Sequence, residues 1–275
     1  MLTAENKLKN LKTKKGKIVL VFSGGLDTSF CVIYLKELGF DVVTVTVDTG
    51  GFTAADIKKI GDQAKKLGVY KHFFINGKND LFDKFVSYII KGNILRGGVY
   101  PLCAGTERLV IGQKIVEVAK KIGANNLAHG STGAGNDQVR FDVALAVLAP
   151  KMKVETPIRD LGISREDEVL YLKKHKVTIS TETKKYSINV GMLGTTVGGN
   201  ETKGSWEIPP EGVIPNFKTL ETASKTPQKI IISFEKGLPV AIDGKKMSGA
   251  EIMEHLNVIG AKHAVGKNIH LGNTI

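Results

Sequence analysis

The chain has 275 residues, of which 42% are hydrophobic and 24% are charged, and its formal net charge is +12. This length allows one large domain or two modest ones, and the composition is that of an ordinary globular protein. No apolar run approaches the ~18 residues that a membrane-spanning helix needs, and the first residues lack the apolar core of a signal peptide. We therefore expect a cytoplasmic protein that does not enter a membrane.

The cysteines and histidines give no sign of a metal centre. Cys31 and Cys103 are far apart in the sequence and form no CxxC pair, which argues against a zinc site or a disulfide framework. The six histidines show no HExxH spacing. We therefore expect no structural metal.

The positive charge is compatible with nucleic acid, with a lysine-rich proteome or with a site for anionic substrates. Most lysines occur as scattered pairs near the ends of predicted helices, where cations complement the helix dipole. The densest lysine cluster lies in and around residues 1–16, which we interpret as a solvated basic extension rather than an RNA-binding segment. We therefore do not expect nucleic acid as a partner.

Residues 17–180 alternate short β segments with amphipathic segments. The patterns predict strands at 17–22, 41–47, 71–75, 126–129 and 153–156, and helices at 28–38, 54–67, 79–91, 106–122 and 164–174. Strands separated by helices imply right-handed crossovers and a parallel sheet covered on both faces. We therefore predict an α/β fold with a Rossmann-like nucleotide-binding domain in this part of the chain.

The pattern changes after about residue 180, so we predict a smaller α+β domain over residues 181–275. Residues 186–206 are rich in Gly, Thr, Ser and Asn without a clear period, and we predict that Gly191 to Gly204 is a mobile segment that orders on substrate binding. Two short β segments, 229–234 and 239–242, predict a hairpin. Ser248 then predicts the cap of a final helix over 249–258.

A glycine-rich string, Val-Phe-Ser-Gly-Gly-Leu-Asp-Thr-Ser, occupies residues 21–29 between the first predicted strand and helix. Doubly wound sheets bind ligands here, at the carboxyl ends of their strands. Gly24 and Gly25 let backbone amides approach an anion, and the helix N-terminus adds unpaired N–H groups. Further hydrogen bonds can come from the hydroxyls of Ser23, Thr28 and Ser29. The string has neither the Walker A lysine nor a GxGxxG pattern, but after an apolar strand it indicates a phosphate site.

Asp27 is unexpected in such a loop, because a carboxylate beside phosphates is repulsive. A divalent cation such as Mg²⁺ between the carboxylate and a pyrophosphate group would remove the conflict. The alternative is a plain turn in which Asp27 is the N-cap of the helix.

A second polar string, His-Gly-Ser-Thr-Gly-Ala-Gly-Asn-Asp-Gln-Val-Arg-Phe, occupies residues 129–141 after a predicted strand. We expect it on the same sheet edge as the phosphate loop. Asn136 can donate and accept hydrogen bonds, Asp137 can bind an ammonium group, and Arg140 can bind a carboxylate with both of its terminal nitrogens. The set suits a substrate that carries an amine and a carboxylate. The alternative is a surface loop with an ordinary Asp–Arg pair.

These strings carry a resemblance to known proteins. SGGLDTS resembles the signature of the N-type ATP pyrophosphatases, which cleave ATP between the α and β phosphates and form an adenylated intermediate. HGSTGAGNDQVRF is very similar to the characteristic string of the argininosuccinate synthase family, and the resemblance spans nearly all of residues 17–275. The order SGGLDTS, VYPLC, HGSTGAGNDQVRF and YSIN is also similar. The resemblance implies a ligase of arginine biosynthesis that joins citrulline and aspartate, using ATP with Mg²⁺ and releasing AMP and pyrophosphate.

The resemblance also implies roles for individual residues. ATP would be held by Val21, Phe22, Ser23, Gly24, Gly25, Leu26, Asp27, Thr28, Ser29, Val47 and Gly130. Aspartate would be bound by Thr132, Asn136 and Asp137. Citrulline would be bound by Tyr100, Gly105, Asn136, Arg140, Ser187 and Thr196. The candidate catalytic residues are Asp27, also the candidate Mg²⁺ ligand, and Asp137. By spacing alone, Tyr100 could equally pack in the core, and Ser187 and Thr196 could lie in a solvated loop.

Three features depart from the family pattern. Gly105 stands where the family usually offers a serine to citrulline, although Thr106 is adjacent, and Gly272 stands where many members have a glutamate. The chain ends at Gly-Asn-Thr-Ile, whereas the family usually continues with a further tyrosine and an arm that joins the subunits of a homotetramer. We therefore expect the second domain to be incomplete, and the sequence leaves open whether the chain is a fragment or a short form.

Two other functions stay open. The first is a tRNA-modifying ATP pyrophosphatase that uses the positive charge and Cys103 as a sulfur carrier. Against it, Cys103 has no CxxC partner and the sequence shows no separate RNA-binding module. The second is an ATP-binding remnant without ligase activity.

Overall fold

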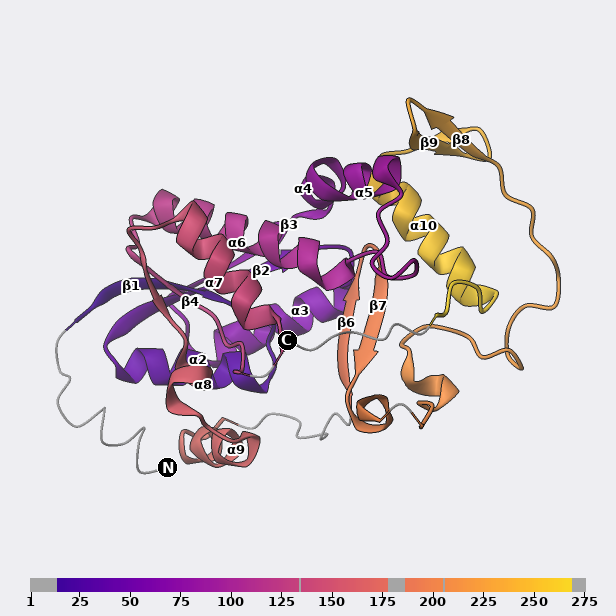
Figure 1. Ribbon diagram of the computed structural model, residues 1–275. Coiled ribbons are helices and arrows are strands. Elements are labelled where there is room, and N and C mark those ends of the chain that lie inside the picture. Colours follow the sequence, from indigo (N-terminus) through magenta and orange to yellow (C-terminus); the bar gives the residue numbers. More distant parts are fainter. Residues whose placement is uncertain (1–13, 134, 178–185, 205, 269–275) are drawn as a thin grey trace.

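The computed structural model describes residues 14–133, 135–177, 186–204 and 206–268. At its centre is a five-stranded parallel sheet with the strand order β3-β2-β1-β4-β5 (Figure 1). The strands are β1 (Gly16–Val21), β2 (Phe40–Asp48), β3 (Lys71–Asn76), β4 (Asn126–Ala128) and β5 (Lys153–Glu155). The prediction of an α/β fold with a parallel sheet is confirmed.

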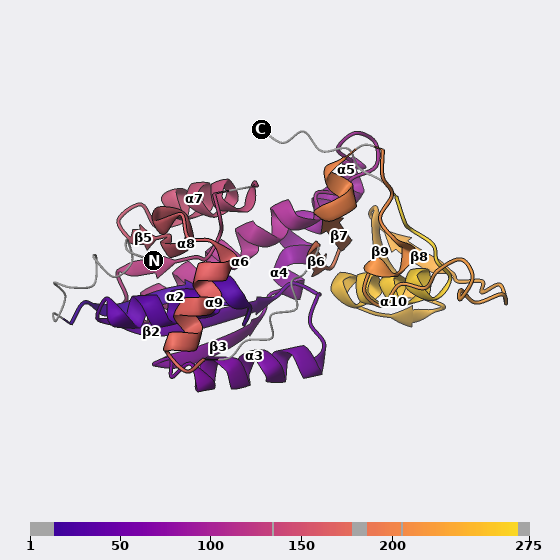
Figure 2. The same ribbon diagram turned by 90° about the horizontal axis from the view of Figure 1, so that it is seen from below.

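Helices cover both faces of this sheet (Figures 1 and 2). One face carries α2 (Leu26–Glu37), α3 (Ala54–Lys66), α8 (Pro157–Leu161) and α9 (Arg165–Lys174). The other carries α4 (Lys78–Leu81), α5 (Ser87–Gly92), α6 (Cys103–Ile122) and α7 (Asp137–Leu148). Side chains alternate along β1, so that Ile18 and Leu20 enter the first core and Val19 enters the second.

Several helix ends follow directly from the sequence. Thr53 caps α3 by accepting a hydrogen bond from the Asp56 amide, and Gly68 follows the helix with a φ of +63°. Ser164 caps α9, and Ser248 forms a capping box with Glu251 at the last helix. The predicted cap at Ser248 is confirmed.

The predicted helix over residues 79–91 is interrupted. A π-helical turn at Phe82–Val86 separates α4 from α5. The ring of Phe82 packs against Gly249 of the final helix, where a Cβ would lie 2.0 Å from the ring. The π-helical turn therefore begins at a residue whose ring contacts the final helix, and the local sequence does not reveal this long-range contact.

Helices α7 and α8 were not predicted. The sequence of α7 hides its period because its outer face is also apolar, with Val139, Val143 and Val147 more than half exposed. As a consequence, Asp137 and Arg140 lie on the first turn of a helix rather than in a loop.

The second half of the chain contains antiparallel sheets. Residues 186–206, whose sequence shows no clear period, contain the hairpin of β6 (Ser187–Gly191) and β7 (Gly194–Gly198), which was not predicted. The remaining strands are β8 (Ile232–Glu235), β9 (Leu238–Ile242) and β10 (Lys245–Lys246), followed by α10 (Gly249–Lys262). Short 3₁₀ turns lie at Asn200–Lys203 and Glu211–Val213. The predicted hairpin and final helix are confirmed, and α10 runs four residues further than predicted.

The turn of the β6–β7 hairpin is inserted into the molecule. The side chain of Met192 is fully buried in the second core. Its N–H donates to the carbonyl of Thr49 at 3.0 Å, and the Asn257 amide of α10 donates to its carbonyl at 2.9 Å. The hairpin therefore joins the parallel sheet to the C-terminal elements, and Figure 1 shows it between them.

Some predictions concern residues outside the described ranges. These are most of the basic extension over residues 1–16, the domain boundary near residue 180, Gly272 and the C-terminal Gly-Asn-Thr-Ile. In the part of the chain that the structure describes, no helix has the length and apolar character needed to cross a membrane.

Candidate active site

The phosphate loop forms the turn between β1 and α2. Gly24 has a φ of +74°, and a Cβ there would lie 3.3 Å from Cγ1 of Ile60 in α3. Gly25 is the extended N-cap residue of α2, and no side chain caps the helix. The loop therefore needs glycine at Gly24, and it presents the N-terminal amides of α2 at the sheet edge.

Two of the predicted hydroxyls are placed to meet a ligand. Ser23 Oγ and Thr28 Oγ1 lie 3.3 Å apart at the open side of the loop. Ser29 is fully buried and accepts a hydrogen bond from the Gln63 amide of α3 at 3.5 Å. The Phe22 ring is also buried, so these last two side chains belong to the core rather than to the open side of the loop.

Asp27 lies in the first turn of α2, where Gly25 is the N-cap, so the alternative that Asp27 caps the helix is wrong. Its Oδ1 is buried without a hydrogen-bond partner, and Nη2 of Arg165 lies 3.9 Å away. Beside it is Glu168 of α9, which sequence reasoning missed. Burial and the negative charge of Asp27 raise the pKa of Glu168 to about 8.

The second glycine-rich string meets the first, as expected from adjacent parallel strands. A Cβ on Gly130 would lie 3.4 Å from Cγ2 of Thr28 and 3.4 Å from Sγ of Cys31. The prediction that the two strings share one sheet edge is confirmed by the pairing of β1 with β4.

His129 anchors the second string and is buried. The Ser131 N–H donates to its Nδ1 at 3.3 Å, so the ring proton lies on Nε2, which faces Asp142 Oδ1 at 3.2 Å. Burial lowers the pKa of His129. His129 is therefore a neutral structural residue.

Asp137 is held by two arginines. Nη1 of Arg140 lies 2.8 Å from its Oδ1, and Nη2 of Arg108 lies 2.9 Å from its Oδ2. Arg108, on α6, also donates to Oδ1 of Asn189 in β6 at 2.9 Å. Sequence reasoning missed Arg108 and Asn189, although Arg108 falls one helical turn after the candidate Gly105.

A buried acid lies next to this cluster. Glu107 is 3% exposed, and a Cβ on Gly191 of the hairpin would lie 1.6 Å from its Oε1. Its Oε2 lies 3.5 Å from Nη1 of Arg108. Burial raises the pKa of Glu107 to about 7, with Asp137 adding to the rise and Arg108 opposing it.

The predicted citrulline residues on α6 and α7 come together. A Cβ on Gly105 would lie 3.9 Å from Nε of Arg140, and the hydroxyl of half-buried Tyr100 accepts a hydrogen bond from the Ala104 N–H at 3.4 Å. Thr106 does not replace the missing serine, because its buried hydroxyl donates to the carbonyl of Cys103 at 3.2 Å.

The hairpin residues lie nearby. Thr196 pairs with Asn189 across the hairpin, so both side chains share the face that meets Arg108. The backbone of Ser187 pairs with Gly198 in the same hairpin.

Other predicted residues are placed less directly. Val47 is buried in the second core, and Gly77 leaves room for its Cγ1, so a nucleoside could meet only its main chain. Val21 and Leu26 are half-buried. Thr132 is exposed, and Asn136 is the N-cap residue of α7 without a capping side-chain bond.

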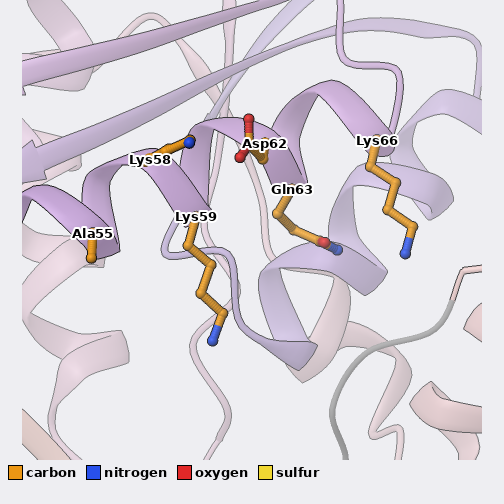
Figure 3. Close-up of a pocket in the computed structure, with 6 residues that line it drawn as sticks. All are labelled: Ala55, Lys58, Lys59, Asp62, Gln63 and Lys66. Atoms are coloured by element: carbon orange, nitrogen blue, oxygen red, sulfur yellow. The ribbon is translucent and has the colours of Figure 1, made fainter.

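A surface depression of about 380 Å³ lies along α3. Its lining comes from one helix: Ala55, Lys58, Lys59, Asp62, Gln63 and Lys66 (Figure 3). None of these is a predicted site residue, and the depression is an open groove of the helix surface rather than a closed binding site.

Comparison with known proteins agrees with this geometry. Residues 17–178 match the family model described as the arginosuccinate synthase N-terminal HUP domain, and residues 186–274 match that of the C-terminal domain. The chain belongs to the argininosuccinate synthase family. Argininosuccinate synthase from Pyrobaculum aerophilum is 41% identical over 94% of this chain and 65% of its own length. That from Methanocaldococcus jannaschii is 40% identical over 90% and 62%, respectively. The chain thus spans less than two thirds of these relatives.

One solved structure is also similar, a predicted subunit of a tRNA methyltransferase from Methanocaldococcus jannaschii. It covers 57% of this chain with a TM-score of 0.39 and 21% identity, which is too distant to bear on function.

In this member of the argininosuccinate synthase family, Cys103 serves packing. Its Sγ donates to the carbonyl of Leu193 in the hairpin at 3.3 Å. Burial raises the pKa of Cys103 to about 11, which disfavours the thiolate that a sulfur carrier requires.

Proposed function

We propose that this chain catalyses the ATP-dependent ligation of citrulline and aspartate to argininosuccinate, with release of AMP and pyrophosphate. One observation carries the proposal. The strand β1, which ends in the glycine turn, pairs with β4, which leads into the string that carries Asp137, and Gly130 of that string approaches Thr28. We infer from this that a nucleotide and an amino acid bind at adjacent points of one sheet edge. The reaction belongs to arginine biosynthesis, and we place it in the cytoplasm.

In this proposal the loop from Ser23 to Ser29 binds the ATP phosphates. The amides of Gly24, Gly25 and the first turn of α2 stabilise the charge that develops on the leaving pyrophosphate. The hydroxyls of Ser23 and Thr28 add donors at the open side of the loop.

Asp137 binds the aspartate amine, with Thr132 and Asn136 beside it. Arg140 and Tyr100 bind citrulline, and the hairpin residues Ser187 and Thr196 close that side. Arg140 and Arg108 both contact Asp137, and these two contacts fix the orientation of its carboxylate.

The reaction then needs no covalent enzyme nucleophile. The ureido oxygen of citrulline attacks the α-phosphorus of ATP, and pyrophosphate leaves. The aspartate amine next attacks the activated carbon, a proton is lost from the nitrogen, and AMP departs. The protein contributes mainly positioning and charge stabilisation.

Mg²⁺ fits the donor set at Asp27, because the buried Oδ1 there lacks a hydrogen-bond partner. A bound Mg²⁺ would neutralise charge on the diphosphate. Assembly into a homotetramer, implied by the family resemblance, is a further part of the proposal.

Pyrophosphate release tests the function. Release from ATP that depends on citrulline and reaches steady turnover only with aspartate supports the ligase. Release that requires tRNA supports the tRNA-modifying alternative, and ATP binding without turnover supports the remnant. The assay should be run with citrulline and aspartate separately and together.

A further inference from the structure

We propose that Glu168 of α9 and Asp27 of α2 together form the protein side of a divalent-cation site beneath the phosphate loop. The inference rests on the proposed function, because the cation is the one that accompanies the ATP phosphates. The inference assigns Glu168 as a ligand, although it lies 141 residues after Asp27 in the sequence.

Helix packing fixes the position of Glu168. Helix α9 lies against α2, and the rings of Tyr171 and Phe30 are 4.8 Å apart between them. Glu168 is 1% exposed, so its carboxyl group cannot turn to solvent. The charges of Glu168 and Asp27 both act on the buried thiol of Cys31 in α2.

One oxygen of each carboxyl group is buried without a hydrogen-bond partner. Among the described residues, the buried side-chain atoms without a hydrogen bond are Oδ1 of Asp27 and Oε2 of Glu168. Buried polar atoms are nearly always satisfied by protein, water or a bound ion. Two such oxygens on facing acids therefore indicate a missing positive or donating group.

The protein supplies little of that charge. Arg165 Nη2 lies 3.9 Å from Asp27 Oδ1, and its side chain is 61% exposed. Two carboxylates that are buried side by side repel each other unless a cation or a shared proton lies between them.

The two carboxylates suit Mg²⁺ better than a metal ion that is bound entirely by protein side chains. Mg²⁺ prefers oxygen ligands, keeps several waters and is usually bound by one or two carboxylates together with substrate phosphates. Within the described residues, no group of three or more His, Cys, Asp or Glu side chains could hold a metal ion. Two carboxylates beneath a phosphate loop match the Mg²⁺ mode of binding. The competing chemistry is a single proton shared by the two acids.

Mn²⁺ binding, followed by electron paramagnetic resonance, tests the site as a probe for Mg²⁺. We would measure Mn²⁺ affinity of the full chain with and without α,β-methylene ATP, for wild type, Glu168→Gln and Glu166→Gln. Glutamine keeps the shape of Glu168 and can donate a hydrogen bond to Asp27, but it removes the anionic ligand. Glu166 lies exposed on the same helix and is the matched control. Thermal melting confirms that each variant is folded.

We expect Glu168→Gln to weaken Mn²⁺ at least about tenfold in both conditions, and Glu166→Gln to leave it unchanged. Equal Mn²⁺ affinity of Glu168→Gln and wild type would overturn the inference and assign the pair to a shared proton. Failure of the analogue to bind would instead count against the proposed function, since the nucleotide-free measurement tests the cation site alone.

Discussion

Asp137 is oriented by side chains from three different elements. Arg140 lies on its own helix, Arg108 comes from α6, and Arg108 is in turn bonded to Asn189 of the hairpin. A guanidinium group can bind two acceptors at once in a fixed plane, which a lysine cannot do. Arg108 is therefore a positioning residue that ties the hairpin to the amino-acid site.

Replacing Arg108 by lysine tests this role. We expect Arg108→Lys to raise the KM for aspartate about tenfold or more with a smaller effect on the KM for ATP, because one of the two acceptors loses its donor. Steady-state kinetics measures the split, and Arg96→Lys, at an exposed position, is the control. An unchanged KM for aspartate would show that Arg108 has no positioning role.

Glu107 gives the protein a predictable dependence of stability on pH. Its pKa is about 7 in the folded state against a usual 4.5, so the folded state keeps a proton that the unfolded state releases. Stability that is present below pH 4.5 is therefore lost as the pH rises toward 7.

Glu107→Gln removes that titration. We expect the free energy of unfolding of Glu107→Gln, relative to that of wild type, to rise by up to about 3 kcal/mol between pH 4.5 and pH 8. Urea unfolding of both proteins at pH 5 and pH 8 measures the change. A constant difference between the two proteins at both pH values would contradict it.

Of the individual site residues, the sequence predicted those that stand in contiguous motifs, but it did not predict the residues that contact them from distant parts of the chain. Gly24, Asp27, Asp137 and Arg140 stand in recognisable motifs. Glu168 reaches its neighbours only through the packing of one helix on another, and this long-range contact leaves no local pattern in the sequence.

Among the elements, the β6–β7 hairpin was not predicted from the sequence. Its composition of Gly, Thr and Ser lacks the apolar alternation of a half-buried strand, since all of the residues of β7 are only partly buried. The hairpin is instead fixed by main-chain bonds at Met192 and by the close fit of Gly191 against Glu107. The parallel strands β1 and β2, by contrast, are indicated by apolar runs that are rich in Val.

Two glycines of the hairpin allow a matched test. A Cβ at Gly191 would collide with the Glu107 carboxylate at 1.6 Å, whereas a Cβ at Gly198 would meet nothing within 4 Å. We expect Gly191→Ala to increase hydrogen exchange throughout β6 and β7 and to cost about 1–3 kcal/mol, with Gly198→Ala close to wild type. Equal protection of the two variants would mean that the hairpin does not depend on this contact.

At the scale of the whole molecule, the C-terminal elements share a core with the parallel sheet. Met192 and Ala250 belong to the same buried cluster as Val19 and Leu127. Lys78 of α4 also lies 2.7 Å from Glu254 of α10. The composition change near residue 180 led us to predict a domain boundary there. It could not show this shared packing, because contacts across the molecule depend on the assembled fold.

Gly249→Ala tests the shared core. The new Cβ would lie 2.0 Å from the Phe82 ring, and we expect a loss of about 1–3 kcal/mol with one cooperative unfolding transition. Gly212→Ala, where nothing lies within 4 Å, is the control. Hydrogen exchange measured at increasing urea concentrations reports the protection of α10 and of the parallel sheet separately. Loss of α10 protection with an unchanged parallel sheet would show that the halves are independent.

The most direct test of the whole account follows the ureido oxygen. We would supply citrulline labelled with ¹⁸O in the ureido group, together with ATP, aspartate and Mg²⁺, and analyse the products by mass spectrometry. Attack of that oxygen on the α-phosphorus predicts that AMP carries the label and that pyrophosphate does not. Unlabelled AMP, or no AMP that depends on citrulline, would contradict a site in which the glycine turn and the Asp137 cluster act on one reaction.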